Sequence, residues 1–408
     1  MLLKILVIII SLLLIGILAH YSGKLAEKIK LPSLIGMIIL GMLIGPALLD
    51  LVPKSTLEIS PYLKDIALVT VLFIGGLGIS LEQMKQIGRP AVLLSVVPAT
   101  FEGITIAFLS MIFLKFTFVQ GAILGFIIAA VSPAVLVPSM VDLINRKIGQ
   151  DKAIPQMLLV GASADDTVAI TLFTTFVSIY MAGINGESIS ITRELINIPF
   201  AILISILTGW LLAVASKNIL KNIKTNSLKV LSTFIACLLI RAVENYLHLE
   251  NFNSLLTIMI YGFFLRTYLV DIAKSIQDGI NVVWKYGKLY LFAFVGMAIN
   301  PTLVGKYLWI GIAMLIISLS IRSIGVIIAL IGTNLSLKER LFCVIAYLPK
   351  ATVQSAKAGI PLQMGIDGGE IMQAIAILSV LVTAPIGAIG IKLSSPKFLK
   401  HPEDSGVA

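Results

Sequence analysis

Long runs of apolar residues, separated by short polar loops, follow one another along this 408-residue chain. A run of roughly 18–25 apolar residues is long enough to cross the hydrocarbon core of a bilayer as a helix. The pattern predicts about thirteen such segments. They cover residues 2–19, 33–51, 64–81, 90–114, 118–143, 155–183, 193–216, 228–247, 253–270, 288–305, 307–332, 338–360 and 370–392. We therefore expect an all-α integral membrane protein with about thirteen transmembrane helices.

Two stretches need a separate interpretation. Residues 271–287 are too polar to span a bilayer and predict an amphipathic helix lying at the membrane interface. The first apolar run, residues 2–19, is not followed by a convincing small-residue cleavage site. We therefore expect it to be the first membrane span and not a signal peptide.

The composition agrees with a lipid environment. Apolar residues make up 58% of the chain and charged residues 13%, with a mean hydropathy of +1.02. A soluble domain has roughly 45–50% apolar and about 25% charged residues. Cys237 and Cys343 lie inside apolar segments, and His20, His248 and His401 lie near segment ends. The sequence therefore predicts no disulfide framework, no resident metal and no cofactor.

The net charge of +10 is explained by the loops between the apolar segments. Most of the 31 Lys and Arg residues lie in loops that follow odd-numbered segments. Positively charged loops remain on the cytoplasmic side of a membrane. The distribution predicts a multi-pass protein of the cell membrane, with its N-terminus outside and its C-terminus in the cytoplasm. The same distribution argues against a nucleic-acid partner.

Two adjacent carboxylates, Asp165 and Asp166, lie in the middle of segment 155–183 among small and apolar residues. A charge at membrane depth costs about 2.5–3.5 kcal/mol on insertion scales, so each one needs a reason. Burial and a neighbouring like charge both favour a protonated carboxyl group. A carboxylate that binds either a proton or a cation couples the movements of the two by competition. The alternative is two structural acids, each paired elsewhere, but one structural pair would not require both.

Helix geometry separates the roles of these two acids. Adjacent residues on a helix point about 100° apart. We expect one carboxylate to face the ion and the other to face a basic partner. The geometry also argues against an intramembrane aspartyl protease, whose two carboxyl groups must share a proton.

Two apolar segments contain prolines at positions where a helix would break. One contains the stretch Ser132–Pro138, and the other contains Pro349 within Tyr347–Thr352. Proline removes an N–H donor and clashes with the preceding turn. In lipid, the freed backbone groups are tolerated only in the protein interior or along a cavity. A simple kink would explain either site alone, whereas a pair of broken helices in corresponding halves indicates the central site of a transporter.

Each broken segment is preceded by a segment that carries a buried charge, Glu102 before the first break and Arg322 before the second. The two sets of segments are separated by an odd offset, as an inverted repeat requires. The pattern predicts a buried Glu102–Arg322 ion pair, with Asp165 as an alternative partner for Arg322. Snorkelling of Arg322 to the interface is the third possibility.

Further charges lie within apolar segments. Lys350 follows the second break and is expected to neutralise the exposed carbonyl groups of the half-helix before it. Arg241 and Glu244, three residues apart, predict a structural pair on one helix face.

Four stretches resemble motifs of the monovalent cation/proton antiporters, most closely those of the NHA branch. They are AVSPAVLVPSM (130–140), GASADDTVAI (161–170), AYLPKATVQ (346–354) and LSVLVTAPIG (378–387). The resemblance runs in order over most of the chain from the third segment onward. It implies the NhaA/NapA-like fold with inverted repeats and two broken, crossing helices. It also implies a homodimer in which a transport core moves like an elevator against a dimerisation scaffold.

The resemblance implies a division of the chain into five regions. Scaffold helices are expected in 1–88, followed by the first half of the transport core in 89–183, with a break near 131–138 and the helix of the aspartate pair. A linker and further scaffold helices, including the interfacial helix, are expected in 184–306. The second half of the core is expected in 307–393, with a break near 347–352, and a short cytoplasmic tail in 394–408.

The resemblance also implies roles for individual residues. Asp166 matches the ion-binding aspartate and Asp165 its partner; together with Ser132 and Thr352 they form the expected set of cation- and proton-binding residues. Ser132 lies at the first helix crossing, where NhaA-type proteins have an Asp.

Glu102, Arg322 and Lys350 match charged positions of the NHA branch. Many electrogenic members have a Lys at the position of Arg322. Because Arg does not release its proton, a Glu102–Arg322 pair favours electroneutral exchange.

These observations predict a secondary active transporter, not an enzyme, that exchanges Na⁺ or Li⁺ for H⁺ and serves pH homeostasis. Its expected partners are the two cations, the bilayer and a second copy of the chain. A K⁺/H⁺ antiporter with the same residues remains an alternative, because selectivity depends on cavity details. A bile-acid-type symporter or a sensor on a related fold is the other alternative.

Overall fold

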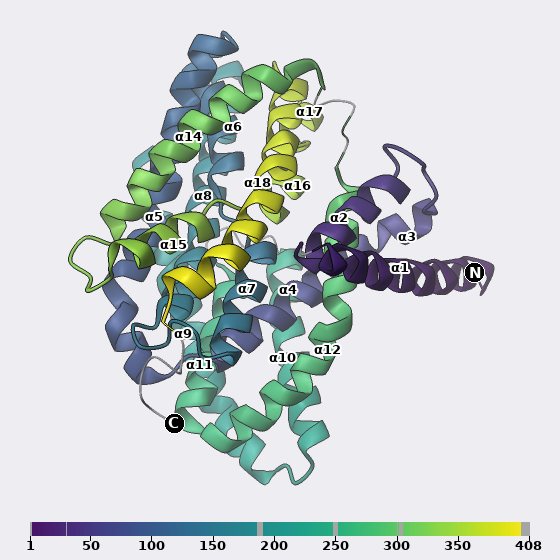
Figure 1. Cartoon of the computed structure of the whole chain (residues 1–408), viewed down its shortest axis with the longest axis vertical. Helices are drawn as coiled ribbons and strands as arrows, with labels where there is room; N and C mark the ends of the chain where they lie inside the picture. The colour runs from purple at the N-terminus through teal and green to yellow at the C-terminus, as the bar shows by residue number, and fades with distance from the viewer. Residues whose placement is uncertain are drawn as a thin grey trace. The chain divides into compact units, whose positions relative to one another are not determined.

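The computed structural model describes residues 2–29, 31–185, 191–247, 252–299, 301 and 305–400. This part of the chain consists of helices and the turns that connect them (Figure 1). The helices group into two compact units, each assembled from segments that are separated in the sequence. The first unit contains Met1–Leu81, Ser205–Leu249 and Ser254–Thr302, and the second contains Glu82–Ile204, Glu250–Asn253 and Leu303–Ala408.

In the described part of the chain, the first unit contains seven helices and the end of an eighth. They are α1 (Leu2–Lys28), α2 (Ser33–Ile44), α3 (Lys54–Glu58), α4 (Ser60–Leu77), α10 (Asn226–Leu247), α11 (Ser254–Tyr268), α12 (Val270–Met297) and the second half of α9 (Ile191–Asn222). Helix α4 packs against both α11 and α12, and α12 also packs against α2.

The second unit carries the segments with the predicted breaks. Its helices are α5 (Leu81–Phe113), α6 (Phe118–Ala129), α7 (Pro133–Asn145), α8 (Ile154–Asn185), the 3₁₀ turn η1 (Gly305–Tyr307), α14 (Leu308–Ala329), α15 (Leu337–Ala346), α16 (Thr352–Lys357), α17 (Ile360–Gln363) and α18 (Gly369–Phe398). Within this unit α6 lies beside α8, and α15 lies beside α18 (Figure 1).

Eight helices in the described part of the chain are long and apolar enough to cross a membrane. Helices α2 and α11 are apolar but shorter, with 12 and 15 residues. The prediction of a multi-pass, all-helical membrane protein is confirmed.

Both predicted breaks are present. Helix α6 ends at Ala129 and α7 begins at Pro133, with Ala130 and Ser132 in extended conformation between them. Pro133 occupies the first turn of α7, where its fixed φ suits the helix and its missing N–H costs nothing. Helix α15 likewise ends before Pro349, and α16 begins at Thr352.

Two expected boundaries differ from the structure. Residues 271–287, expected to form a separate interfacial helix, are the first part of the continuous 28-residue helix α12. No proline interrupts this stretch, so backbone hydrogen bonding continues as the sequence changes from polar to apolar. The expected tail from 394 onward begins too early, because α18 continues to Phe398.

Candidate functional site

The two adjacent aspartates lie on α8 inside the second unit. Asp165 is fully buried and Asp166 is 7% exposed. The Val131 backbone N–H donates a 2.7 Å hydrogen bond to Asp165 Oδ2, and Arg322 Nη2 lies 3.6 Å from the same oxygen. The Oδ1 atoms of both aspartates have no hydrogen-bond partner among the described residues. Asp165 therefore faces a basic partner, and Asp166 does not form an ion pair within this part of the chain.

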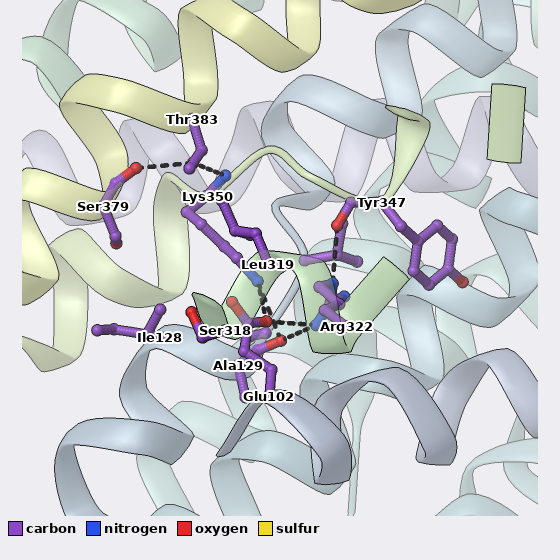
Figure 2. Close-up of polar contacts among 12 residues, drawn as sticks. Glu102, Ile128, Ala129, Ser318, Leu319, Arg322, Tyr347, Lys350, Ser379 and Thr383 are labelled. Atoms are coloured by element: carbon purple, nitrogen blue, oxygen red, sulfur yellow. Dashed lines mark hydrogen bonds and ion pairs between the residues drawn. The ribbon is translucent and has the colours of Figure 1, made fainter. Parts of the chain in front are cut away.

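A second group of buried charges surrounds Glu102 on α5 (Figure 2). Glu102 Oε2 accepts hydrogen bonds from Arg322 Nη1 at 2.7 Å and from Lys350 Nζ at 2.6 Å. All three side chains are fully buried. Arg322 thus has both of its expected partners, with a hydrogen bond to Glu102 and a longer ion pair to Asp165. Its complete burial excludes snorkelling.

The side chains of Arg322 and Lys350 also bind carbonyl groups at the ends of the broken helices. Arg322 Nη1 donates to the Ala129 carbonyl at the end of α6, and Arg322 Nε donates to the Tyr347 carbonyl at 2.8 Å (Figure 2). Lys350 Nζ lies 3.3 Å from the Ala129 carbonyl oxygen. The expectation that Lys350 neutralises its own preceding half-helix is therefore corrected. Lys350 instead neutralises the negative end of the other broken helix, which lies across from it.

The two breaks are hydrogen-bonded directly to each other. The backbone N–H of Ser132 donates to the Pro349 carbonyl at 2.8 Å. The Lys350 N–H donates to Thr383 Oγ1 at 2.9 Å, so α18 also supports the second break (Figure 2). The Ser132 hydroxyl is fully buried and has no partner in the described part of the chain. Thr352 begins α16, and its side chain lies outside the described residues.

The sequence interpretation missed two amides near the aspartates. Gln354 is fully buried, and its Nε2 lies within hydrogen-bond distance of three backbone carbonyls, those of Ile127 and Ile128 at the end of α6 and that of Ala130 in the break. It is the last residue of the AYLPKATVQ motif, and a buried amide one turn after a break was the signal that could have identified it. Asn253 donates to Thr167 Oγ1, next to Asp166, but no pattern in its loop indicated this contact.

Among the residues that the structure describes, no three or more His, Cys, Asp or Glu side chains gather into a group that could hold a metal ion. The available ligands for a cation are carboxylate and hydroxyl oxygens, which suit a hard ion.

Comparison with known proteins fixes the family. Residues 5–394 match the model of the transmembrane sodium/hydrogen exchanger family. This chain belongs to the sodium/hydrogen exchanger family. Sodium/hydrogen exchanger 9B2 of Xenopus tropicalis is 32% identical, over 95% of this chain and 74% of the relative. The Homo sapiens 9B2 protein is 30% identical over 94% and 74%. Sodium/hydrogen exchanger 9B1 of Mus musculus is 29% identical over 94% and 70%.

A solved structure shares the fold of this exchanger. The sodium proton antiporter MjNhaP1 from Methanocaldococcus jannaschii superposes with a TM-score of 0.76 and covers 97% of this chain and 99% of that chain. At 21% identity, this likeness defines the fold and leaves the site residues to be argued from this chain. The predicted membership in the monovalent cation/proton antiporters is confirmed.

Proposed function

We propose that this exchanger moves Na⁺ or Li⁺ against H⁺ by alternating access, with Asp166 as the main cation-binding carboxylate and Asp165 as its partner. The proposal rests on the burial of the two carboxylates and on their unpartnered oxygen atoms. Both are buried on α8, and the Oδ1 atom of each lacks a hydrogen-bond partner among the described residues. A buried carboxylate oxygen without a partner gains free energy by binding either a proton or a cation. The two ions then compete for one site, and competition couples their movements.

Ser132 supports this assignment with a third oxygen. Its buried hydroxyl lacks a partner in the described part of the chain, and the neighbouring residue, Val131, donates its N–H to Asp165. We propose that Ser132 and Thr352 complete the oxygen ligands of the transported ion. Glu102 is not proposed as a ligand, because one of its oxygens already pairs with both Arg322 and Lys350.

The charges of the cluster support one-for-one exchange. Glu102, Asp165 and Asp166 carry three negative charges when ionised, and Arg322 and Lys350 carry two positive charges. The ionised cluster therefore has a net charge of −1. One bound monovalent cation or one bound proton makes it neutral, which is the form that burial favours.

The larger architecture is proposed as in other antiporters of this fold. When each interrupted pair counts as one span, the helices support about thirteen spans. An inverted repeat relates the helices from α5 through α8 to the helices from α14 through α18. The segments of the second unit correspond to the proposed core, and those of the first unit to the proposed scaffold. We propose an elevator-like homodimer in the cell membrane, with its N-terminus outside and its C-terminus in the cytoplasm.

Proton flux in proteoliposomes tests the function. A pH-sensitive dye would report flux after separate additions of Na⁺, Li⁺ and K⁺, with wild type beside Asp166→Asn. Asp278→Asn is the matched control, because Asp278 is exposed on α12. We expect Na⁺ and Li⁺ to drive flux in wild type and the control but not in Asp166→Asn. Flux driven only by K⁺ would favour the K⁺/H⁺ alternative, and no flux from folded wild type with any cation would contradict antiport.

A further inference from the structure

Gln354 connects the two helix breaks through an amide that the proposed transport mechanism does not use. Its Nε2 lies 3.2, 3.1 and 2.9 Å from the carbonyl oxygens of Ile127, Ile128 and Ala130. Its Oε1 accepts a 2.9 Å hydrogen bond from the Ala351 N–H. One fully buried side chain therefore binds backbone groups of the first break and of the second.

The contact to Ala130 has a consequence for Asp165. The Ala130 carbonyl and the Val131 N–H belong to one planar, trans peptide group, so they point in opposite directions. Gln354 holds the carbonyl side at 2.9 Å, and the N–H side donates to Asp165 Oδ2 at 2.7 Å. A hydrogen-bonded chain thus runs from the Gln354 amide, through one peptide group, to the carboxylate of Asp165.

This peptide group needs a side-chain partner because it lies outside regular helix. Helix α6 ends at Ala129, and Ala130 has extended backbone angles of φ −61° and ψ 136°. The last four carbonyl groups of a helix have no partner within that helix. Here the two N–H groups of the Gln354 amide are shared among the carbonyls of Ile127, Ile128 and Ala130, while Arg322 and Lys350 supply donors for Ala129.

We propose that Gln354 is a positioning residue for the cation site. It fixes the orientation of the Ala130–Val131 peptide, so that the Val131 N–H holds Asp165 Oδ2 and leaves Asp165 Oδ1 available for the transported ion. This role rests on the proposed cation/proton exchange. It differs from a purely structural role, in which Gln354 satisfies buried backbone groups and the affinity for cations does not depend on it.

Three variants separate the parts of the side chain. Gln354→Met has a similar length without donor or acceptor. Gln354→Glu keeps an acceptor for the Ala351 N–H but removes the donors to the three carbonyls. Gln354→Asn keeps the amide on a chain one methylene shorter, and it serves as the mild variant if the others do not fold. The matched controls are Gln363→Met, Gln363→Glu and Gln363→Asn, because Gln363 is exposed on α17.

The first measurement is the Na⁺ and Li⁺ dependence of proton flux in proteoliposomes of the full-length chain. Loss of a hydrogen bond that fixes a charged ligand corresponds to about tenfold in binding. We expect the KM for both cations to rise about tenfold in Gln354→Met, and by less in Gln354→Asn and in Gln354→Glu, whose added negative charge attracts the cation, with Vmax within about twofold of wild type. An unchanged KM in a folded variant overturns the proposal, whatever happens to the melting temperature.

The second measurement does not depend on transport. Backbone amide hydrogen exchange of the full-length protein in detergent reports whether the Val131 N–H is still held. We expect faster exchange at residues 131–132 in Gln354→Met and no change there in Gln363→Met. If wild type moves no cation, the proposed function fails, while exchange still decides the positioning role. Unaltered exchange at Val131 overturns that role independently.

Discussion

At the residue scale, a single carboxylate oxygen of Glu102 pairs with two buried, positively charged side chains. Its Oε2 accepts hydrogen bonds from both Arg322 and Lys350. The two side chains also share the backbone carbonyl oxygen of Ala129. Glu102→Gln would leave two buried positive charges without their carboxylate. Breaking a buried ion pair in this way costs about 3–5 kcal/mol in soluble proteins.

We therefore expect a clearly lower melting temperature for Glu102→Gln in detergent, together with weaker Na⁺-driven flux. The cluster becomes more positive and attracts a cation less strongly. The control is Glu27→Gln, because Glu27 is exposed near the end of α1. Thermal unfolding followed by intrinsic fluorescence would check the prediction, and a melting temperature equal to that of wild type would contradict the role of Glu102.

Tyr347 and Gly161 give a second prediction at this scale. A Cβ atom added at Gly161 would lie 2.3 Å from the Tyr347 hydroxyl oxygen and 3.0 Å from Leu94 Cβ. The hydroxyl is buried and has no hydrogen-bond partner in the described part of the chain. Gly161→Ala should therefore displace the Tyr347 ring from α8. Because Gly161 lies one turn before Asp165, we expect the variant to lose both stability and transport.

The matching change, Tyr347→Phe, removes that hydroxyl. We expect it to be neutral or slightly stabilising alone, because it deletes a buried group that makes no hydrogen bond. We also expect it to restore part of the stability lost in Gly161→Ala. Melting temperatures of the two single variants and the double variant would show this coupling. Strictly additive effects would mean that the two groups do not meet.

The sequence could identify the charged residues of the site but not all of their partners. Asp165, Glu102 and Arg322 stand out because a charge at membrane depth is costly wherever it lies. Which carboxylate pairs with Arg322 depends on how distant helices pack. In the structure Arg322 lies within ion-pair distance of both Glu102 and Asp165. The role of Gln354 could not be predicted, because a neutral amide in an apolar segment gives a much weaker signal than a charge.

At the element scale, close helix packing in the first unit depends on glycines. Gly76 of α4 faces α11, and a Cβ added there would lie 2.0 Å from the Met259 carbonyl oxygen. In membranes, small residues allow helix backbones to approach closely, and this packing replaces the hydrophobic effect between helices. We expect Gly76→Ala to lower the melting temperature, because backbone on both sides must move.

Gly88 of α5 is the matched control for this packing. A Cβ added at Gly88 would meet nothing within 4 Å. Ala has a higher helix propensity than Gly by about 1 kcal/mol, so Gly88→Ala should be neutral or stabilising. Thermal unfolding of both variants in detergent would check the pair of predictions. Equal melting temperatures would refute close α4–α11 packing at Gly76.

Element boundaries could be predicted where a backbone constraint marks them. Pro133 and Pro349 identified both breaks, because proline acts on the helix itself. The continuity of α12 could not be read from hydropathy. Hydropathy indicates where the environment changes from water to lipid, and a helix can pass through that change without ending.

At the scale of the whole molecule, each unit gathers segments from distant parts of the chain. Composition and proline positions do not indicate which segments pack together, so the expected grouping came from the family resemblance. What the sequence does indicate is the charge that each half contributes to the core. Glu102 and Asp165 come from the first half, and Arg322 and Lys350 come from the second.

The charge moved in one transport cycle follows from this cluster. In the proposed mechanism, the cluster has a net charge of −1 when ionised and is neutral with one Na⁺ or with one H⁺, so both loaded forms would carry the same charge through the membrane. A second proton would require another group of the cluster to change its protonation state. Arg322 does not release its proton, and Lys350 Nζ is held 2.6 Å from Glu102. We therefore expect one-for-one exchange whose rate does not respond to membrane potential.

A potential imposed with K⁺ and valinomycin would check this expectation in proteoliposomes that report Na⁺-driven proton flux. The rate should be the same at zero potential and at either polarity, because no net charge crosses per cycle. Lys350→Met is an informative companion, since it removes the Lys350 amine while leaving Arg322 paired with Glu102. A wild-type rate that rises with one polarity, together with loss of that response in Lys350→Met, would contradict electroneutral exchange and identify Lys350 as the carrier of a second proton.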